Sequence, residues 1–199
     1  MVKLNNILES AYKSFDLDGA DLRRKPLNES MKALNFEGKD CSKCSGLCCT
    51  SAHNSMLITP LEALELYLYL DRKNRINTEL IDRLNQNIAE FRLDKELPVG
   101  SGRVFRRNYT CPFYKHEGLG CSVSPKHKPY GCLSFNSTIQ GVSEPGHCKV
   151  YGEVIDKREA IHSEKENIAN EFIKAELSLY WDKKNISSAL MDLINLIKH

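Results

Sequence analysis

Apolar residues recur three or four positions apart near the start of the chain, which is the spacing of an amphipathic helix. These positions are Leu4, Ile7, Leu8, Ala11, Tyr12 and Phe15. They predict a helix over residues 3–16, followed by a loop at Asp18-Gly19. A second, shorter helix is expected over residues 27–34.

Two more apolar stripes of the same spacing occur in the last quarter of the chain. One comprises Ile161, Ile168, Phe172, Ala175 and Leu179, and the other comprises Ile186, Ala189, Leu190, Leu193, Ile194 and Ile197. They predict C-terminal helices within residues 157–198, with a break near residues 182–185. We expect both stripes to pack into the core, with an interaction with a second copy left open for the last stripe.

The segment 60–93 is expected to be a helical insert between two cysteine-bearing stretches. Thr59-Pro60-Leu61-Glu62 combines a hydroxyl cap, a proline at the first helical position and a glutamate three residues after the cap. This combination predicts a helix over residues 60–73. Buried positions at helical spacing predict another over residues 79–93.

The chain changes character over residues 98–146, which hold seven of its eleven glycines and five of its seven prolines. Such a stretch is typical of turns and irregular coil. Short strands are expected at most around residues 103–107 and 133–139. The predicted fold is therefore mainly α, with amphipathic helices packed around an irregular, cysteine-rich, metal-binding coil.

Composition indicates one globular domain over residues 1–199. Of these residues, 41% are hydrophobic and 27% are charged, and the net charge of +2 is too balanced for a polycation that binds nucleic acid. The most apolar stretch, 61–70, contains Glu62 and Glu65 and is too short to span a membrane. Because no apolar run follows the N-terminus as in a secretory signal, a cytoplasmic location is expected.

Eight cysteines in a reducing compartment favour metal binding or redox chemistry over structural disulfides. Cys41 and Cys44 have the two-residue gap that lets one turn direct two sulfurs at one metal, and Cys48 follows within reach. Gly46 supplies the positive φ that such a turn requires. Cys49 is expected either to bind a second metal or a multi-iron cluster, or to be a small buried hydrophobic residue.

The remaining cysteines are Cys111, Cys121, Cys132 and Cys148. Each lies beside a proline, a glycine or a histidine, residues that shape a tight turn or can themselves bind metal. The metal-binding segments are therefore predicted to be 41–49 and 111–148, with all eight cysteines as candidate ligands. Convergence of the two segments in space is the central expectation.

The chain resembles the YkgJ-type cysteine-cluster family, which is described as zinc- or iron-chelating. The resemblance covers about residues 41–148. It is carried by Cys41-x2-Cys44-x3-Cys48-Cys49, the helix start at Thr59, Cys111-Pro112-Phe113, Gly120-Cys121, Pro129 and Cys132-Leu133-Ser134-Phe135. It implies metal ligation by the matching cysteines. A similar cysteine pattern in flagellin lysine methylase is associated with an iron–sulfur cluster.

Spacing alone does not distinguish an iron–sulfur cluster from zinc, since each uses four thiolates per centre. The Cys48-Cys49 pair and the resemblance favour the iron–sulfur cluster, with zinc as the alternative. His53, His116, His127 and His147 are candidates to replace a cysteine, although a solvated or packed histidine is the simpler interpretation.

The segment 103–128 carries six basic residues against one glutamate, interleaved with aromatic residues. It is either a surface for an acidic ligand or RNA, or a set of cations that offsets the charge of metal-bound thiolates, and we favour the second.

The sequence thus predicts an intracellular metal-binding protein. A redox or modifying enzyme, a zinc-stapled binding module without catalysis, and a metal buffer or insertion factor all remain open. A partner protein is also left open, and the sequence identifies no catalytic residue.

Overall fold

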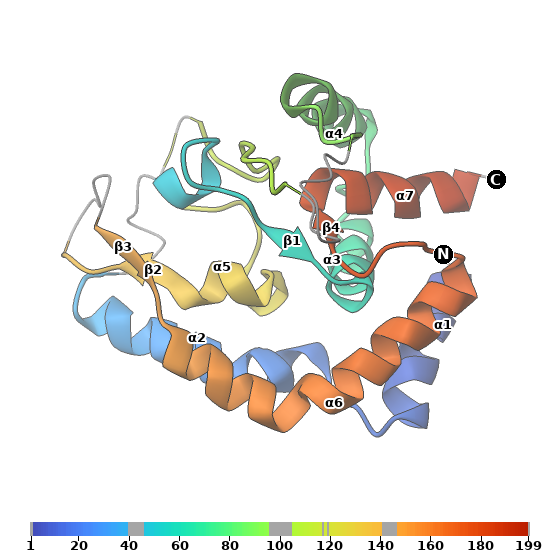
Figure 1. The fold of residues 1–199 in the computed structure, drawn as a ribbon, viewed down its shortest axis with the longest axis horizontal. Coiled ribbons are helices and arrows are strands. Elements are labelled where there is room, and N and C mark those ends of the chain that lie inside the picture. The colour runs from blue at the N-terminus through green and yellow to red at the C-terminus, as the bar shows by residue number, and fades with distance from the viewer. Residues whose placement is uncertain are drawn as a thin grey trace.

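The computed structural model describes residues 2–39, 46–95, 105–116, 118, 120–140 and 147–198. Within these residues the chain forms seven α-helices and two small antiparallel sheets (Figure 1). The helices are α1 (Val2–Ser14), α2 (Ala20–Phe36), α3 (Pro60–Arg72), α4 (Thr78–Phe91), α5 (Tyr130–Ser134), α6 (Gly152–Leu177) and α7 (Ile186–Lys198). Leu47–Cys49 (η2) and Pro125–His127 (η3) form single 3-10 turns. The predicted mainly-α fold is confirmed.

Helix α3 is the centre of the hydrophobic core. It is buried from Pro60 to Leu68, and it packs against α1, α6 and α7. The predicted start is confirmed, because Thr59 accepts a hydrogen bond from the backbone of Glu62 while Glu62 accepts one from the backbone of Thr59. The stripes of α1 and α7 also enter this core, as their spacing predicts.

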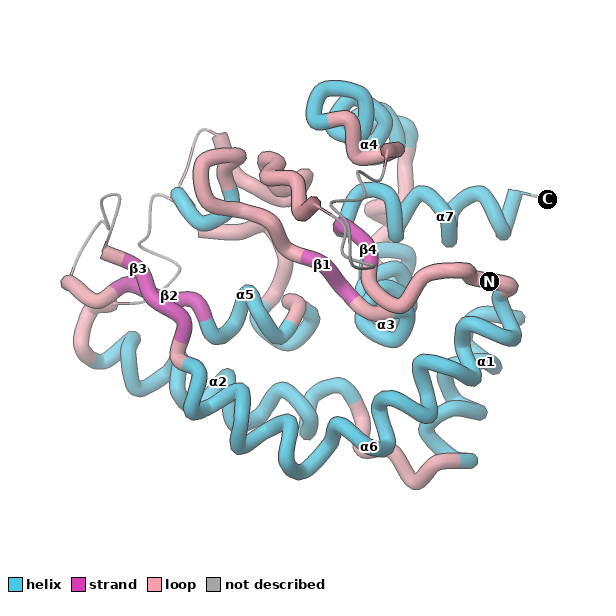
Figure 2. The backbone as a smooth tube through the Cα atoms, viewed as in Figure 1, coloured by secondary structure: helices cyan, strands magenta, loops and turns pink. Residues whose placement is uncertain are grey.

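The strands are very short and form two separate pairs, as Figure 2 shows. Strand β1 (Leu57–Ile58) pairs with β4 (Lys184–Asn185), and β2 (Phe135–Ser137) pairs with β3 (Cys148–Val150). The first pairing fixes the loop before α3 to the start of α7. Strand β2 lies within the predicted range 133–139. Residues 105–107 form no strand, and 103–104 lie outside the described residues.

Helix α2 is longer than the predicted 27–34, since it begins at Ala20 and contains Pro26. Proline removes one backbone hydrogen bond inside a helix, so an added anchor is needed. Arg23 and Arg24, both completely buried, provide that anchor through ion pairs to α3 and α6. The apolar spacing did not predict the first turns of α2, because buried arginines rather than apolar residues anchor them.

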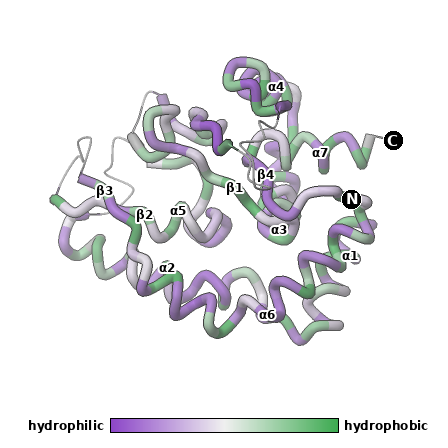
Figure 3. The backbone as a smooth tube through the Cα atoms, in the orientation of Figure 1, coloured by the Kyte–Doolittle hydropathy of each residue, from purple (hydrophilic) through white to green (hydrophobic). Residues whose placement is uncertain are grey.

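Helix α6 begins at Gly152 rather than 157, and its predicted apolar face is only partly confirmed, since Phe172 and Leu179 pack in the core while other members do not. Ile161 and Ile168 are 66% and 47% exposed. The buried side instead carries Arg158, His162, Glu166, Ala169, Asn170, Ile173 and Leu177. Hydrophilic and hydrophobic residues alternate along α6 in Figure 3, because polar residues of this helix face the interior.

None of the helices in the described part of the chain combines the length and the hydrophobicity required to cross a bilayer.

Candidate metal centre

Five cysteines, carried by η2, by the segment before η3 and by α5, line one cavity of about 530 Å³. They are Cys48, Cys49, Cys111, Cys121 and Cys132, and we call them the cavity thiols. The structure thus brings Cys111, Cys121 and Cys132 from the second predicted metal-binding segment to the same cavity as Cys48 and Cys49, at the end of the first segment. Cys41 and Cys44 lie outside the described residues. Cys148 lies on β3, opposite Ser137, and does not line the cavity.

The turn that carries Cys48 and Cys49 depends on Gly46. Its φ is +75°, in the region that favours glycine, and the Cys49 amide donates to its carbonyl at 2.7 Å. A Cβ at this position would lie 2.7 Å from the ring of Tyr114. Both the backbone conformation and the close approach therefore require glycine, as the sequence predicts.

The two cysteine segments are joined by backbone and side-chain contacts. The Cys111 amide donates to the Cys49 carbonyl at 2.6 Å, and the thiols of the same two residues are hydrogen-bonded. A second thiol contact joins Cys49 to Cys48. Residues 62 positions apart in the chain are thus held in direct contact.

Cys121 and Cys132 reach the cavity from two further elements. Residues 111–116 and 120–122 are joined by backbone contacts, with Tyr114 and Cys121 forming an isolated bridge and the Ser122 amide donating to the Phe113 carbonyl at 3.1 Å. Cys132 lies on α5, whose first turn is closed by a 3.0 Å hydrogen bond from the Cys132 amide to Pro129. Tight turns therefore position both thiols.

The thiols influence each other's protonation. The hydrogen bond to Cys111 raises the pKa of Cys49, and burial raises it further. Burial also raises the pKa of Cys132 well above its usual value, with the nearby Cys49 and Cys121 acting in the same direction. Cys49, Cys111, Cys121 and Cys132 form no disulfide. This clustering disfavours thiolates unless a cation compensates their charge.

Within the described residues, no three histidine, cysteine, aspartate or glutamate side chains are arranged so that they could hold a metal ion. The cavity thiols therefore line a common space without forming a ligand set. Their donor chemistry nonetheless suits an iron–sulfur cluster or zinc, since thiolate sulfur is the preferred ligand of both.

Cations and one candidate histidine also line the cavity. Arg106 and the buried Lys128 do so, and Lys128 lowers the pKa of Cys132. Of the four candidate histidines, all of which fall in the described chain, only His53 lines this cavity. His127 instead stacks on Tyr69, with ring centroids 4.1 Å apart, and His116 packs edge-on against Tyr114.

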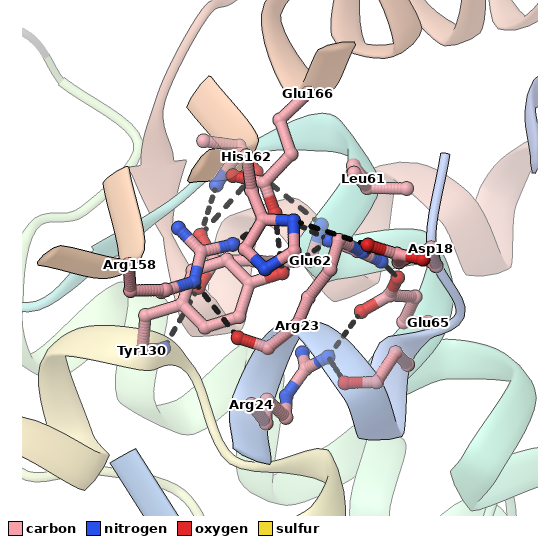
Figure 4. Close-up of polar contacts among 12 residues, drawn as sticks. Asp18, Arg23, Arg24, Leu61, Glu62, Glu65, Tyr130, Arg158, His162 and Glu166 are labelled. Carbon is pink, nitrogen blue, oxygen red and sulfur yellow. Dashed lines mark hydrogen bonds and ion pairs between the residues drawn. The ribbon is translucent and has the colours of Figure 1, made fainter. Parts of the chain in front are cut away.

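A buried cluster of charges, shown in Figure 4, contributes Tyr130, Arg158 and Glu166 to the lining of this cavity. We call it the ionic cluster, and its members are Arg23, Arg24, Glu65, Tyr130, Arg158 and Glu166. Glu65 pairs with both Arg23 and Arg24, the latter at 2.7 Å. Burial alone would raise the pKa of Glu65, but Arg24 and Arg23 outweigh it and lower the pKa below its usual value.

Tyr130 links the ionic cluster to the helix that carries Cys132. Its hydroxyl donates to Glu166 at 2.8 Å, and its ring lies under the guanidinium of Arg158, whose central carbon is 3.4 Å from the ring centroid. Its amide donates to Glu62 at 3.0 Å. Two residues earlier, the Lys128 carbonyl accepts from Arg24 at 2.9 Å. The start of α5 is therefore held by α2, α3 and α6.

Sequence reasoning missed the ionic cluster. One signal was present, since Glu62 and Glu65 interrupt an otherwise apolar helix, and charged residues in a buried helix require partners. The partners come from residues up to 143 positions away and have no common motif.

No protein-family model, characterised protein or solved structure matches this chain.

Proposed function

We propose that this chain is a metal-binding protein that holds an iron–sulfur cluster through clustered cysteines. Its candidate ligands are the cavity thiols together with Cys41 and Cys44. The observation that carries the proposal is the approach of five thiols, from segments far apart in sequence, to one cavity. Unligated thiols have no evident reason to be gathered in this way, whereas a metal centre requires it.

The charges around the cavity support the same proposal. Four thiolates around a cluster core or a zinc ion leave a net charge of about minus two. Lys128, which is 5% exposed, and Arg106 are placed to offset it. When bound, an iron–sulfur cluster would supply one-electron transfer or an iron site for a substrate. The residues of the chain would hold that centre and limit its contact with water.

Zinc is the alternative, because its preferred ligands are the same thiolates. The adjacent Cys48 and Cys49 favour the cluster, because neighbouring side chains rarely bind one mononuclear ion together. A metal buffer or insertion factor would differ by releasing its metal readily to a chelator. The presence of clustered thiols is also consistent with a reducing, cytoplasmic environment.

The decisive experiment is anaerobic purification followed by elemental analysis and absorption spectroscopy. We expect a brown protein with absorption near 400 nm and stoichiometric iron and sulfide. A colourless protein with stoichiometric zinc would support the alternative, and a metal-free, fully folded protein would contradict both. Retention of metal during dialysis against a chelator distinguishes a resident centre from a metal buffer.

A further inference from the structure

The cavity extends beyond the thiols to α6, where a polar stripe faces it. Glu159, Ser163, Asn167 and Asn170 line the cavity at intervals of four, four and three residues, which places them on one face of the helix. The side chains of Ser163 and Asn167 are exposed and make no hydrogen bond to another described residue. If the cavity thiols hold a metal centre, the side of the cavity that α6 lines remains available to another ligand.

Two charged side chains of this wall keep one polar atom each uncommitted. Glu166 receives Tyr130, Arg23 and Arg158 on the same oxygen, Oε1. Arg158, 2% exposed, donates through Nε to the Arg23 carbonyl and through Nη2 to Glu166. Within the described chain this leaves Arg158 Nη1 as a cationic donor and Glu166 Oε2 as an anionic acceptor. The ion pair between the two residues places these atoms close together.

The neighbouring groups define the rest of the ligand. Lys183 and Glu159, one charge of each sign, also line the cavity, so neither sign dominates. Met56, Leu66 and Val123 add apolar contacts. A ligand with only one charge would contact either Arg158 or Glu166, whereas a ligand with both charges can contact the two side chains at once.

We propose that this cavity binds a small zwitterion of the α-amino-acid class, with its carboxylate on Arg158 Nη1 and its ammonium group on Glu166 Oε2. An aliphatic side chain would extend toward the apolar residues and the cavity thiols. The site would hold the ligand beside the proposed metal centre, but its recognition groups are separate from the metal ligands. It therefore goes beyond the proposed function and does not depend on which metal is bound.

The test is calorimetric titration of the purified protein with L-norleucine, hexanoate and hexylamine, and with L-alanine as a shorter amino acid. Norleucine carries both charged groups, and the other two six-carbon probes carry one each. We expect norleucine to bind at least about tenfold more tightly than hexanoate or hexylamine, because each charge-assisted contact contributes about that factor. Equal binding of either single-charge probe, or no binding of either amino acid, would overturn the proposal.

Substitutions on α6 locate the site without removing the buried ion pairs. Ser163→Leu and Asn167→Leu place a larger side chain in the cavity, and each should weaken norleucine binding by at least about tenfold. Glu164→Leu, on the outer side of the same helix, is the matched control and should change affinity by less than about twofold. Unchanged binding in both cavity variants would place the ligand elsewhere and refute the assignment.

Metal content is measured on the same samples, so the two proposals fail separately. Norleucine binding without any metal would contradict only the metal centre. Stoichiometric metal without norleucine binding would contradict only the zwitterion site.

Discussion

The cavity thiols and the ionic cluster are neighbours, yet they are held in different ways. The thiols lie on turns and a five-residue helix, which backbone contacts such as Cys111 to Cys49 keep together. The ionic cluster lies mainly on α2, α3 and α6, where each charge has a partner of opposite sign. The charges of the ionic cluster are therefore balanced within the chain, whereas the cavity thiols are like groups that favour the addition of a cation.

This difference indicates that the two regions depend on different sources of stability. Buried charges on rigid helices are stable as long as none of their partners is lost. Thiols on irregular coil gain most of their order from whatever they bind, since metal binding and folding are thermodynamically linked. The comparison can be tested by disturbing each region in turn.

Cys111→Ser should have the largest effect, because a serine hydroxyl is not deprotonated at neutral pH and is a poor ligand for iron or zinc. We expect the metal content per chain to fall by at least about half. Amide hydrogen exchange should become faster in residues 46–56 and 105–135, while α1, α3 and α7 remain protected. Elemental analysis and exchange measurements check both parts.

Cys148→Ser is the matched control for this prediction. It makes the same chemical change on β3, at a cysteine that does not line the cavity. If the metal ligands are the cysteines that line the cavity, metal content should differ from the wild-type value by no more than about 10%. An equal loss of metal in both variants would show that the thiol region extends to β3.

Glu65→Gln should be the most destabilising change in the ionic cluster. It leaves Arg23 and Arg24 buried without their shared carboxylate, and breaking a buried pair on one side costs about 3–5 kcal/mol. Urea unfolding followed by circular dichroism measures this loss. Glu79→Gln is the control, because it breaks an ion pair to Arg83 that is largely exposed and should cost less than about 1 kcal/mol.

The same comparison explains how much could be predicted from sequence. The cap at Thr59, the stripes of α1 and α7, and the turn at Gly46 depend on local rules of spacing and backbone conformation, and they were predicted correctly. The approach of Cys111 to Cys49 was expected only because one residue type recurred in two segments. The recurrence of cysteine was the signal that linked these two distant segments of the chain.

The ionic cluster lacked such a signal. The buried side of α6 carries Arg158, His162 and Glu166, which a hydrophobic scale assigns to solvent. Their burial is explained only when the partners on α2 and α3 are known, and those pairings depend on tertiary structure. The exposed Ile161 was assigned to the core for the same reason.

Acid should weaken the ionic cluster over a predictable pH range. The pKa of Glu65 is lowered in the folded state, because the attraction of Arg24 and Arg23 outweighs burial. Its contribution to stability is therefore complete above the unfolded value of about 4.3 and is lost as pH falls through the folded value. The difference in unfolding free energy between wild type and Glu65→Gln should be constant near neutral pH and shrink below about pH 4. A difference that persisted at lower pH would assign the effect to packing rather than to charge.

Tyr130→Phe should produce the smallest effect and tests whether the two regions are coupled. The change removes the hydroxyl that donates to Glu166 at 2.8 Å but keeps the ring under Arg158 and the amide on Glu62. We expect a loss of about 1.5–3 kcal/mol of stability in urea, because the hydroxyl both donates to Glu166 and accepts from Arg23, and both partners are charged. Because the start of α5 stays anchored by Glu62 and by Arg24 on Lys128, metal content should be unchanged. A variant that instead lost metal while keeping its urea stability would show that the tyrosine hydroxyl positions Cys132, and that the ionic cluster supports the cavity thiols directly.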